Sequence, residues 1–172
     1  EQLFEKVQAW IDEQLPTNED ITKAFDEWLG AIPYYETHFF NLGAGERAED
    51  WQILTPRRAG AVGSNELNLN IKSRYRGHWL GEATKPSRKI PKPIGDMQVT
   101  YGDKVICNRN HSNYSYFPRK DNALKYVANG EVGVAVGPRR TRHKRPPLSK
   151  LEVEFTSQAG IQYKFSTNND DL

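Results

Sequence analysis

Gly-Asp-Lys-Val-Ile-Cys-Asn-Arg-Asn at residues 102–110 and Asn-Gly-Glu-Val-Gly-Val-Ala-Val at residues 129–136 carry the strongest structural signals of this chain. Each segment is a turn followed by an apolar run, and Asn129-Gly130 is typical of a tight hairpin turn. We therefore expect β-strands at about 104–108 and 131–136. The alternation of Leu151, Val153 and Phe155 predicts another strand. With strands also expected at 113–117 and 161–166, five short strands in about seventy residues predict a small β-barrel.

The N-terminal half has helical periodicity instead. Apolar residues repeat at helical spacing over residues 2–14, and a second helix is expected after Thr17 or Asn18, either of which can cap it. Trp51–Thr55 reads as a short buried strand, followed by a basic loop with glycines and a helix from Ser64 to about Tyr75. A strand, a glycine-bearing loop and a helix form the unit of an α/β domain.

Residues 76–100 differ from both halves, because prolines lie among lysines and arginines there, which predicts an extended connector. The expected fold class is thus α+β, with a partial α/β layer followed by a small β-barrel. The expected domains are residues 1–78, a basic connector at 79–100, and the barrel at 101–172.

Charge is distributed very unevenly along the 172 residues. Residues 1–50 carry 3 basic and 12 acidic side chains, a net of −9; residues 51–150 carry 20 and 6, a net of +14; residues 151–172 carry 1 and 4. A basic block of this size, with aromatic residues among the cations, favours nucleic acid as a partner over a merely solubilising surface.

Several kinds of site have no sequence signature here. No Gly-x-x-x-x-Gly-Lys-Ser/Thr loop is present to hold a triphosphate, and the four histidines lack metal-ligand spacing. We therefore expect neither a catalytic site nor a metal or other cofactor in this chain. The acidic first twenty residues are unlike a secretory signal, and no apolar run is long enough to cross a membrane. The single cysteine, Cys107, suits a reducing cytoplasm.

Two segments resemble RecD-like superfamily 1 DNA helicases. Residues 102–110 and 129–136 are similar to the Gly-Asp-Lys-Val…Arg-Asn strand and the Asn-Gly-Glu hairpin of the SH3-like barrel inserted in the second motor domain of that family. Residues 51–70 resemble the strand, Pro, basic loop and helix of its motif IV region. The resemblance implies a fragment, with part of the second RecA-like domain and the inserted SH3-like barrel. ATP and Mg would then be cofactors of the parent protein. The remainder of the helicase chain would be a partner of this fragment.

In the resembled family an arginine near motif IV helps to sense the nucleotide. Arg57 and Arg58 are the candidates here, although Ala59 stands where many relatives have the arginine. Three roles remain open for the pair: sensing nucleotide in the parent, contacting DNA phosphates, or an ordinary surface position.

The candidate nucleic-acid-binding residues are aromatic or basic. Single-stranded nucleic acid is held by cationic grooves with aromatic stacking platforms. Alternation places Tyr114 and Tyr116 on one face of a strand and Phe117 on the other, so either the tyrosines or Phe117 are exposed. The cationic loop before residue 150 is the stronger candidate. The full set is Arg109, Tyr114, Tyr116, Arg139, Arg140, Arg142, Lys144 and Arg145.

These observations predict a fragment of an ATP-dependent DNA helicase that grips single-stranded DNA and supplies part of the ATP cleft, without catalytic activity of its own. The alternative is a stand-alone, non-enzymatic nucleic-acid-binding protein with an SH3-like barrel.

Overall fold

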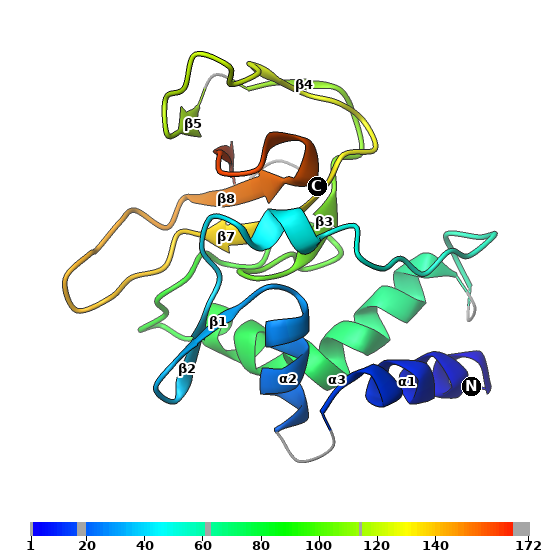
Figure 1. Cartoon of the computed structure of the whole chain (residues 1–172). Helices are drawn as coiled ribbons and strands as arrows, with labels where there is room; N and C mark the ends of the chain where they lie inside the picture. The colour runs from blue at the N-terminus through cyan, green and yellow to red at the C-terminus, as the bar shows by residue number, and fades with distance from the viewer. Residues whose placement is uncertain (1, 17–19, 61–62, 114, 167–172) are drawn as a thin grey trace.

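The computed structural model describes residues 2–16, 20–60, 63–113 and 115–166 of the chain. Within them the fold is mixed α+β, with three α-helices on one side of a five-stranded antiparallel sheet (Figure 1). The helices are α1 (Gln2–Gln14), α2 (Ile21–Trp28) and α3 (Ser64–Thr84), with short 3-10 helices η1 (Ala44–Arg47) and η2 (Thr156–Gln158). The strands are β1 (Ile32–Tyr34), β2 (Thr37–Phe39), β3 (Lys104–Ile106), β4 (His111–Ser112), β5 (Tyr116–Phe117), β6 (Tyr126–Val127), β7 (Val132–Gly137), β8 (Lys150–Phe155) and β9 (Gln162–Ser166).

The two N-terminal helices form where the apolar periodicity predicts them. α1 has the predicted bounds. Ile11 and, just after the helix, Leu15 are buried, whereas Leu3 and Trp10 are exposed. Asp20 caps α2, because its carboxylate accepts a hydrogen bond of 3.0 Å from the backbone N–H of Thr22. The predicted caps, Thr17 and Asn18, lie outside the described residues. None of the described helices combines the length and the apolar composition that crossing a bilayer requires.

Residues 51–55 form no strand, so that prediction is wrong. Trp51 stacks on Trp28 with ring centroids 4.4 Å apart, and Lys104 donates to the Trp51 carbonyl. The ring and the carbonyl of Trp51 are therefore both in contact with other side chains, and no strand pairing is needed at this position. Leu54, expected to be buried, is 87% exposed. The strand, loop and helix unit expected for an α/β layer is consequently absent from the described part of the chain.

α3 continues to Thr84, past the predicted end at Tyr75, so residues 76–84 are helical rather than extended. The prediction of an extended connector came from Pro86, Pro91 and Pro93, but all three lie beyond the end of the helix and do not interrupt it. Packing decides the length of the helix, since every fourth residue along it is buried. These residues are Leu67, Ile71, Tyr75, Trp79 and Ala83.

The five-stranded sheet has the order β3-β7-β8-β9-β5, and all its pairs are antiparallel. Its strands lie in the five segments predicted from the sequence, except that β7 continues one residue further, to Gly137. The outer strands, β3 and β5, do not pair with each other in the described residues, so the expected closed barrel is not formed there. β4 and β6 make a separate two-stranded ladder, and β1 and β2 make a hairpin.

β7 joins the helical part to the sheet. Val132, Val134 and Val136 belong to the same apolar core as the helices, whereas Ala135 belongs to a second core formed within the sheet. The alternation of side chains along one strand therefore serves both cores. The helices and the sheet thus meet through direct packing, although the two parts were predicted as separate domains.

Candidate nucleic-acid interface

The strongest cluster of exposed cations lies in the connection between β7 and β8. This connection, residues 138–147 and called the basic loop below, projects beyond the edge of the sheet (Figure 1). Four of its cations are exposed, and no carboxylate of the described residues forms an ion pair with any of them. They are Arg140, Arg142, Lys144 and Arg145.

Arg139 behaves differently from the other cations of the basic loop. Its guanidinium lies 4.2 Å from the ring centroid of Phe39 and 4.9 Å from that of Trp79, and it donates a hydrogen bond of 2.6 Å to the carbonyl of His38. The side chain is therefore used to attach the loop to the β1–β2 hairpin and to α3. Arg139 was predicted to bind nucleic acid, but the structure gives its guanidinium internal partners.

Backbone hydrogen bonds hold the rest of the basic loop in shape. Arg140 N–H donates to the carbonyl of Lys89 over 2.6 Å, and Thr141 N–H donates to the carbonyl of Lys144 over 2.8 Å. Lys144 N–H returns a bond of 3.0 Å to the Thr141 hydroxyl. The exposed cations thus stand on a fixed turn, which reduces the ordering cost of binding a polyanion.

A cavity of about 590 Å³ lies on one side of the basic loop. Its wall includes aromatic rings and three of the loop cations, Arg139, Lys144 and Arg145. Aromatic and cationic groups are the two kinds that hold single-stranded nucleic acid. Glu152 also lines it, but that carboxylate is paired with Lys164 at 3.4 Å. The aromatic and cationic members of the wall include Phe39, Tyr101, Phe117, Lys144 and Arg145.

β5 exposes Phe117 rather than Tyr116, which answers the alternative left open by the alternation. Tyr116 is 8% exposed and its ring lies 5.8 Å from that of Tyr163, whereas Phe117 is 58% exposed. Tyr116 therefore belongs to the core of the sheet and offers little of its face for stacking. Tyr114 lies outside the described residues.

Arg109 is separated from the basic loop by the length of β7. It follows β3, whose last residue, Ile106, pairs with Val132 at the start of β7. The basic loop begins after Gly137 at the other end of that strand. Six residues of strand span about 17 Å, so Arg109 cannot belong to the same compact cluster of cations.

Arg57 and Arg58 lie at the N-terminus of α3. Their carbonyls accept hydrogen bonds of 3.0 and 3.1 Å from the N–H groups of Ser64 and Asn65, and both side chains are exposed. The strand expected immediately before them, Trp51–Thr55, is not formed, so they do not lie at the carboxyl end of a strand. Neither arginine lines either of the two cavities beside the basic loop, so their role stays a prediction.

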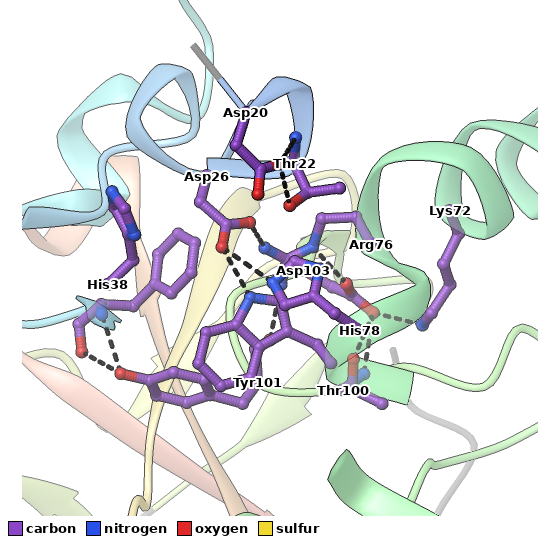
Figure 2. Close-up of polar contacts among 12 residues, drawn as sticks. Asp20, Thr22, Asp26, His38, Lys72, Arg76, His78, Thr100, Tyr101 and Asp103 are labelled. Atoms are coloured by element: carbon purple, nitrogen blue, oxygen red, sulfur yellow. Dashed lines mark hydrogen bonds and ion pairs between the residues drawn. The ribbon is translucent and has the colours of Figure 1, made fainter. Parts of the chain in front are cut away.

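A buried ion network joins α2, α3 and the turn before β3 (Figure 2). Arg76 forms an ion pair with Asp26, which is 1% exposed, and a second one with Asp103 over 3.3 Å. Lys72 also pairs with Asp103. Burial alone would raise the pKa of Asp26, but hydrogen bonds from His78 and Trp79 and the charge of Arg76 outweigh it and lower that pKa.

This network gives the Gly102-Asp103 pair a structural meaning that sequence reasoning missed. Gly102 has φ 80, and a Cβ there would collide with the Phe40 ring and the Arg76 guanidinium. Asp103 accepts a hydrogen bond of 2.8 Å from Thr100 N–H. The signal that could have revealed the network is the row of charged residues on α3 that face its buried side, namely Lys72 and Arg76.

Glu154 is a second buried carboxylate that the sequence did not single out. It is on β8, and it accepts backbone hydrogen bonds from Gly43 at 2.7 Å, Gly45 at 2.9 Å and Gly160 at 2.6 Å. A Cβ at Gly45 would meet Glu154 at 2.6 Å, so glycine is needed for this close approach. Both buried networks hold the fold together. None of their carboxylates, Asp26, Asp103 and Glu154, lines the cavity beside the basic loop.

Comparison with protein-family models, curated proteins and solved structures gives no match to this chain. Among the described residues no three His, Cys, Asp or Glu side chains are grouped so that they could hold a metal ion. The geometry of the basic loop and its cavity is therefore the basis for a functional assignment.

Proposed function

We propose that this chain binds the phosphate backbone of single-stranded DNA through the basic loop, without reading sequence. One observation carries the proposal: Arg140, Arg142, Lys144 and Arg145 are exposed on a fixed turn, and no described carboxylate neutralises them. Clustered cations without counter-charges attract a polyanion, and release of its counterions drives association.

The cavity beside the basic loop supports single-stranded over double-stranded nucleic acid. Phe117 is exposed in its wall, and Lys144 and Arg145 line the same cavity. An exposed ring can stack on a base only when the base is not paired in a duplex. We therefore assign base stacking to Phe117 and phosphate contacts to the loop cations.

The parent protein in this proposal is a RecD-like superfamily 1 DNA helicase. The support is the resemblance of residues 102–110 and 129–136, together with an open antiparallel sheet in the region assigned to the SH3-like barrel. Residues 51–70 give less support, because the strand that opens the motif IV region is not formed at 51–55. In such a parent, ATP and Mg would be bound by other parts of the chain in the cytoplasm. Arg57 and Arg58 would face the nucleotide or the DNA.

A stand-alone nucleic-acid-binding protein is the second candidate. The observation that favours it is the shared packing at β7, because Val132, Val134 and Val136 fill the helical core and make the two parts one continuous structure. The sequence of the parent gene separates the candidates. A P-loop upstream and a Thr-x-His-Lys motif downstream would support the helicase, and their absence would support the second candidate.

The binding proposal is tested by fluorescence anisotropy with a labelled oligothymidylate. The native chain is expected to bind, and the Arg142→Ala, Arg145→Ala variant to bind more weakly, because each lost cation removes a phosphate contact. The matched control is Lys6→Ala, Lys23→Ala, which removes the same charge from α1 and α2. Equal weakening in both variants, or no binding by the native chain, would contradict the proposal.

A further inference from the structure

A second cavity, of about 410 Å³, lies between the basic loop and the chain that follows α3. Three cations line it and no carboxylate does, which distinguishes it from the cavity that contains Glu152. Its volume falls in the range of small-ligand pockets. The lining residues are Pro86, Arg88, Lys92, Arg140, Leu148 and Ser149, and they are called the cationic pocket below.

Arg88 is the residue that gives the cationic pocket a specific chemistry. Its Nε is the one buried side-chain nitrogen or oxygen atom in the described part of the chain that lacks a hydrogen-bond partner. A buried donor without an acceptor is unfavourable, so nearly all such groups in folded proteins are satisfied. An oxygen of a bound anion would satisfy this one.

The other cations of the cationic pocket also have donors to spare. Arg140 uses Nε for the Pro146 carbonyl, 3.1 Å away, and its two terminal nitrogens form no bond with the described residues. Lys92 is exposed and forms no ion pair with them. Glu82, the acidic residue six positions before Arg88, is already paired with Lys85 at 3.2 Å.

Backbone contacts fix the two arginines relative to each other. Arg140 N–H donates to the carbonyl of Lys89, the residue after Arg88, over 2.6 Å. Arg88 N–H donates to the carbonyl of Lys85 over 3.1 Å, which holds this stretch against the end of α3. Ile90 is fully buried and anchors the same stretch in the core. The donors are thus preorganised on two segments that are distant in sequence.

We infer that the cationic pocket is a phosphate site, in which the Arg88 and Arg140 guanidinium groups and the Lys92 ammonium bind one phosphate group. Guanidinium groups match the geometry of phosphate oxygens, and three positive charges exceed what a single carboxylate would need. The phosphate comes from the backbone of the bound strand, a step that rests on the proposed DNA-binding function. A free phosphate has the same chemistry and is the other source to be distinguished.

This site would extend the grip of the basic loop. Arg140 belongs both to that loop and to the cationic pocket, so a strand that follows the loop cations reaches the pocket next. One further phosphate contact raises the salt dependence of binding by about 0.7 in the slope of log K against log salt.

The test uses the NMR signal of the Arg88 Nε–H group in the native 172-residue chain, titrated separately with inorganic phosphate and with oligothymidylate. Oligothymidylate is expected to shift this signal, because an unbonded N–H gains an acceptor. Arg88→Gln is expected to weaken oligothymidylate binding about tenfold, as loss of a charged hydrogen bond does. Arg88→Lys, which keeps the charge without the guanidinium, should recover only part of the affinity. Thermal melts check that both variants fold.

Each outcome separates this site from the proposed function. A shift with both probes supports the site and its occupation by DNA. A shift with inorganic phosphate alone, while the oligonucleotide binds, supports the site and overturns its assignment to the strand. If oligonucleotide binding depends on Arg142 and Arg145 but the Arg88 signal moves with neither probe, the phosphate site is wrong and the proposed function stands. If phosphate shifts the signal but no oligonucleotide binds, the site stands and the proposed function fails.

Discussion

Arg76 on α3 and Asp103 in the turn before β3 are joined by a hydrogen bond of 3.3 Å between Nε and Oδ1 (Figure 2). The pair connects the helical part to the first strand of the sheet. Arg76 also donates over 2.6 Å to the carbonyl of Tyr101, so one buried guanidinium fixes the turn at both ends.

Replacing Asp103 is therefore expected to destabilise the whole chain. Asp103→Ala leaves the buried Lys72 ammonium without a counter-charge and removes one of the two carboxylates that pair with Arg76, which costs about 3 kcal/mol of unfolding free energy. Urea denaturation measures the loss. Asp96→Ala is the matched control, because Asp96 is exposed, and it should stay within about 0.5 kcal/mol of the native chain. Equal stability of the two variants would show that the network does not hold the two parts together.

The pH dependence of stability follows from the lowered pKa of Asp26. A carboxylate with a lowered pKa in the folded state contributes stability that is fully present above its unfolded pKa, near 3.8. That contribution is lost as the pH falls from there through the lower folded pKa. The unfolding free energy of the native chain should thus fall more steeply on acidification below pH 3.8 than that of Asp26→Asn.

The measurement is a series of urea titrations at decreasing pH for both proteins. Other carboxylates titrate equally in each, so the difference between the curves isolates Asp26. Parallel curves would mean that the folded and unfolded states protonate this group alike.

Substitutions at Phe117 and Tyr116 are expected to have different effects, the first on DNA binding and the second on stability. Phe117→Ala is expected to weaken oligothymidylate binding by about 1–3 kcal/mol, the value of one stacked base, with little change in melting temperature. Tyr116→Ala should instead lower the melting temperature, because its ring is in the core. The opposite result, with Tyr116 needed for binding and Phe117 only for stability, would refute the assignment of the stacking face.

ATP turnover is expected to stay at background with and without single-stranded DNA. Phosphoryl transfer requires a P-loop lysine and a magnesium-binding carboxylate in register, and the sequence contains no P-loop motif. A steady-state ATPase assay checks this. Hydrolysis that purifies with the chain and disappears in Arg57→Ala, Arg58→Ala would overturn the expectation.

The strands of the sheet were predictable because short-range alternation and turn residues define them. Leu151, Val153 and Phe155 alternate, and all three are buried as that pattern requires. The prediction of a strand at Trp51–Thr55 was wrong, and the local sequence could not show why. Trp51 stacks on Trp28, which lies on a helix distant in sequence. The extension of α3 past Tyr75 likewise depends on tertiary packing, because Trp79 and Ala83 are buried in the core.

The candidate site, too, could be predicted only in part from the sequence. Composition located the cations of the basic loop, but it could not tell that Arg139 is held by Phe39 and Trp79 while Arg142 stays exposed. Pairing of Arg140 with Arg88 across one cavity depends on a backbone bond between residues 89 and 140, which no local pattern encodes.

The salt dependence of DNA binding tests the central claim most directly. Anisotropy with a labelled oligothymidylate across a salt series should give a steep negative slope of log K against log salt for the native chain. Arg142→Ala, Arg145→Ala should reduce that slope by about 1.4, at ~0.7 for each single-strand phosphate contact, while Lys6→Ala, Lys23→Ala leaves it unchanged. An unchanged affinity and slope in the Arg142→Ala, Arg145→Ala variant would contradict the assignment of the basic loop as the DNA-gripping surface.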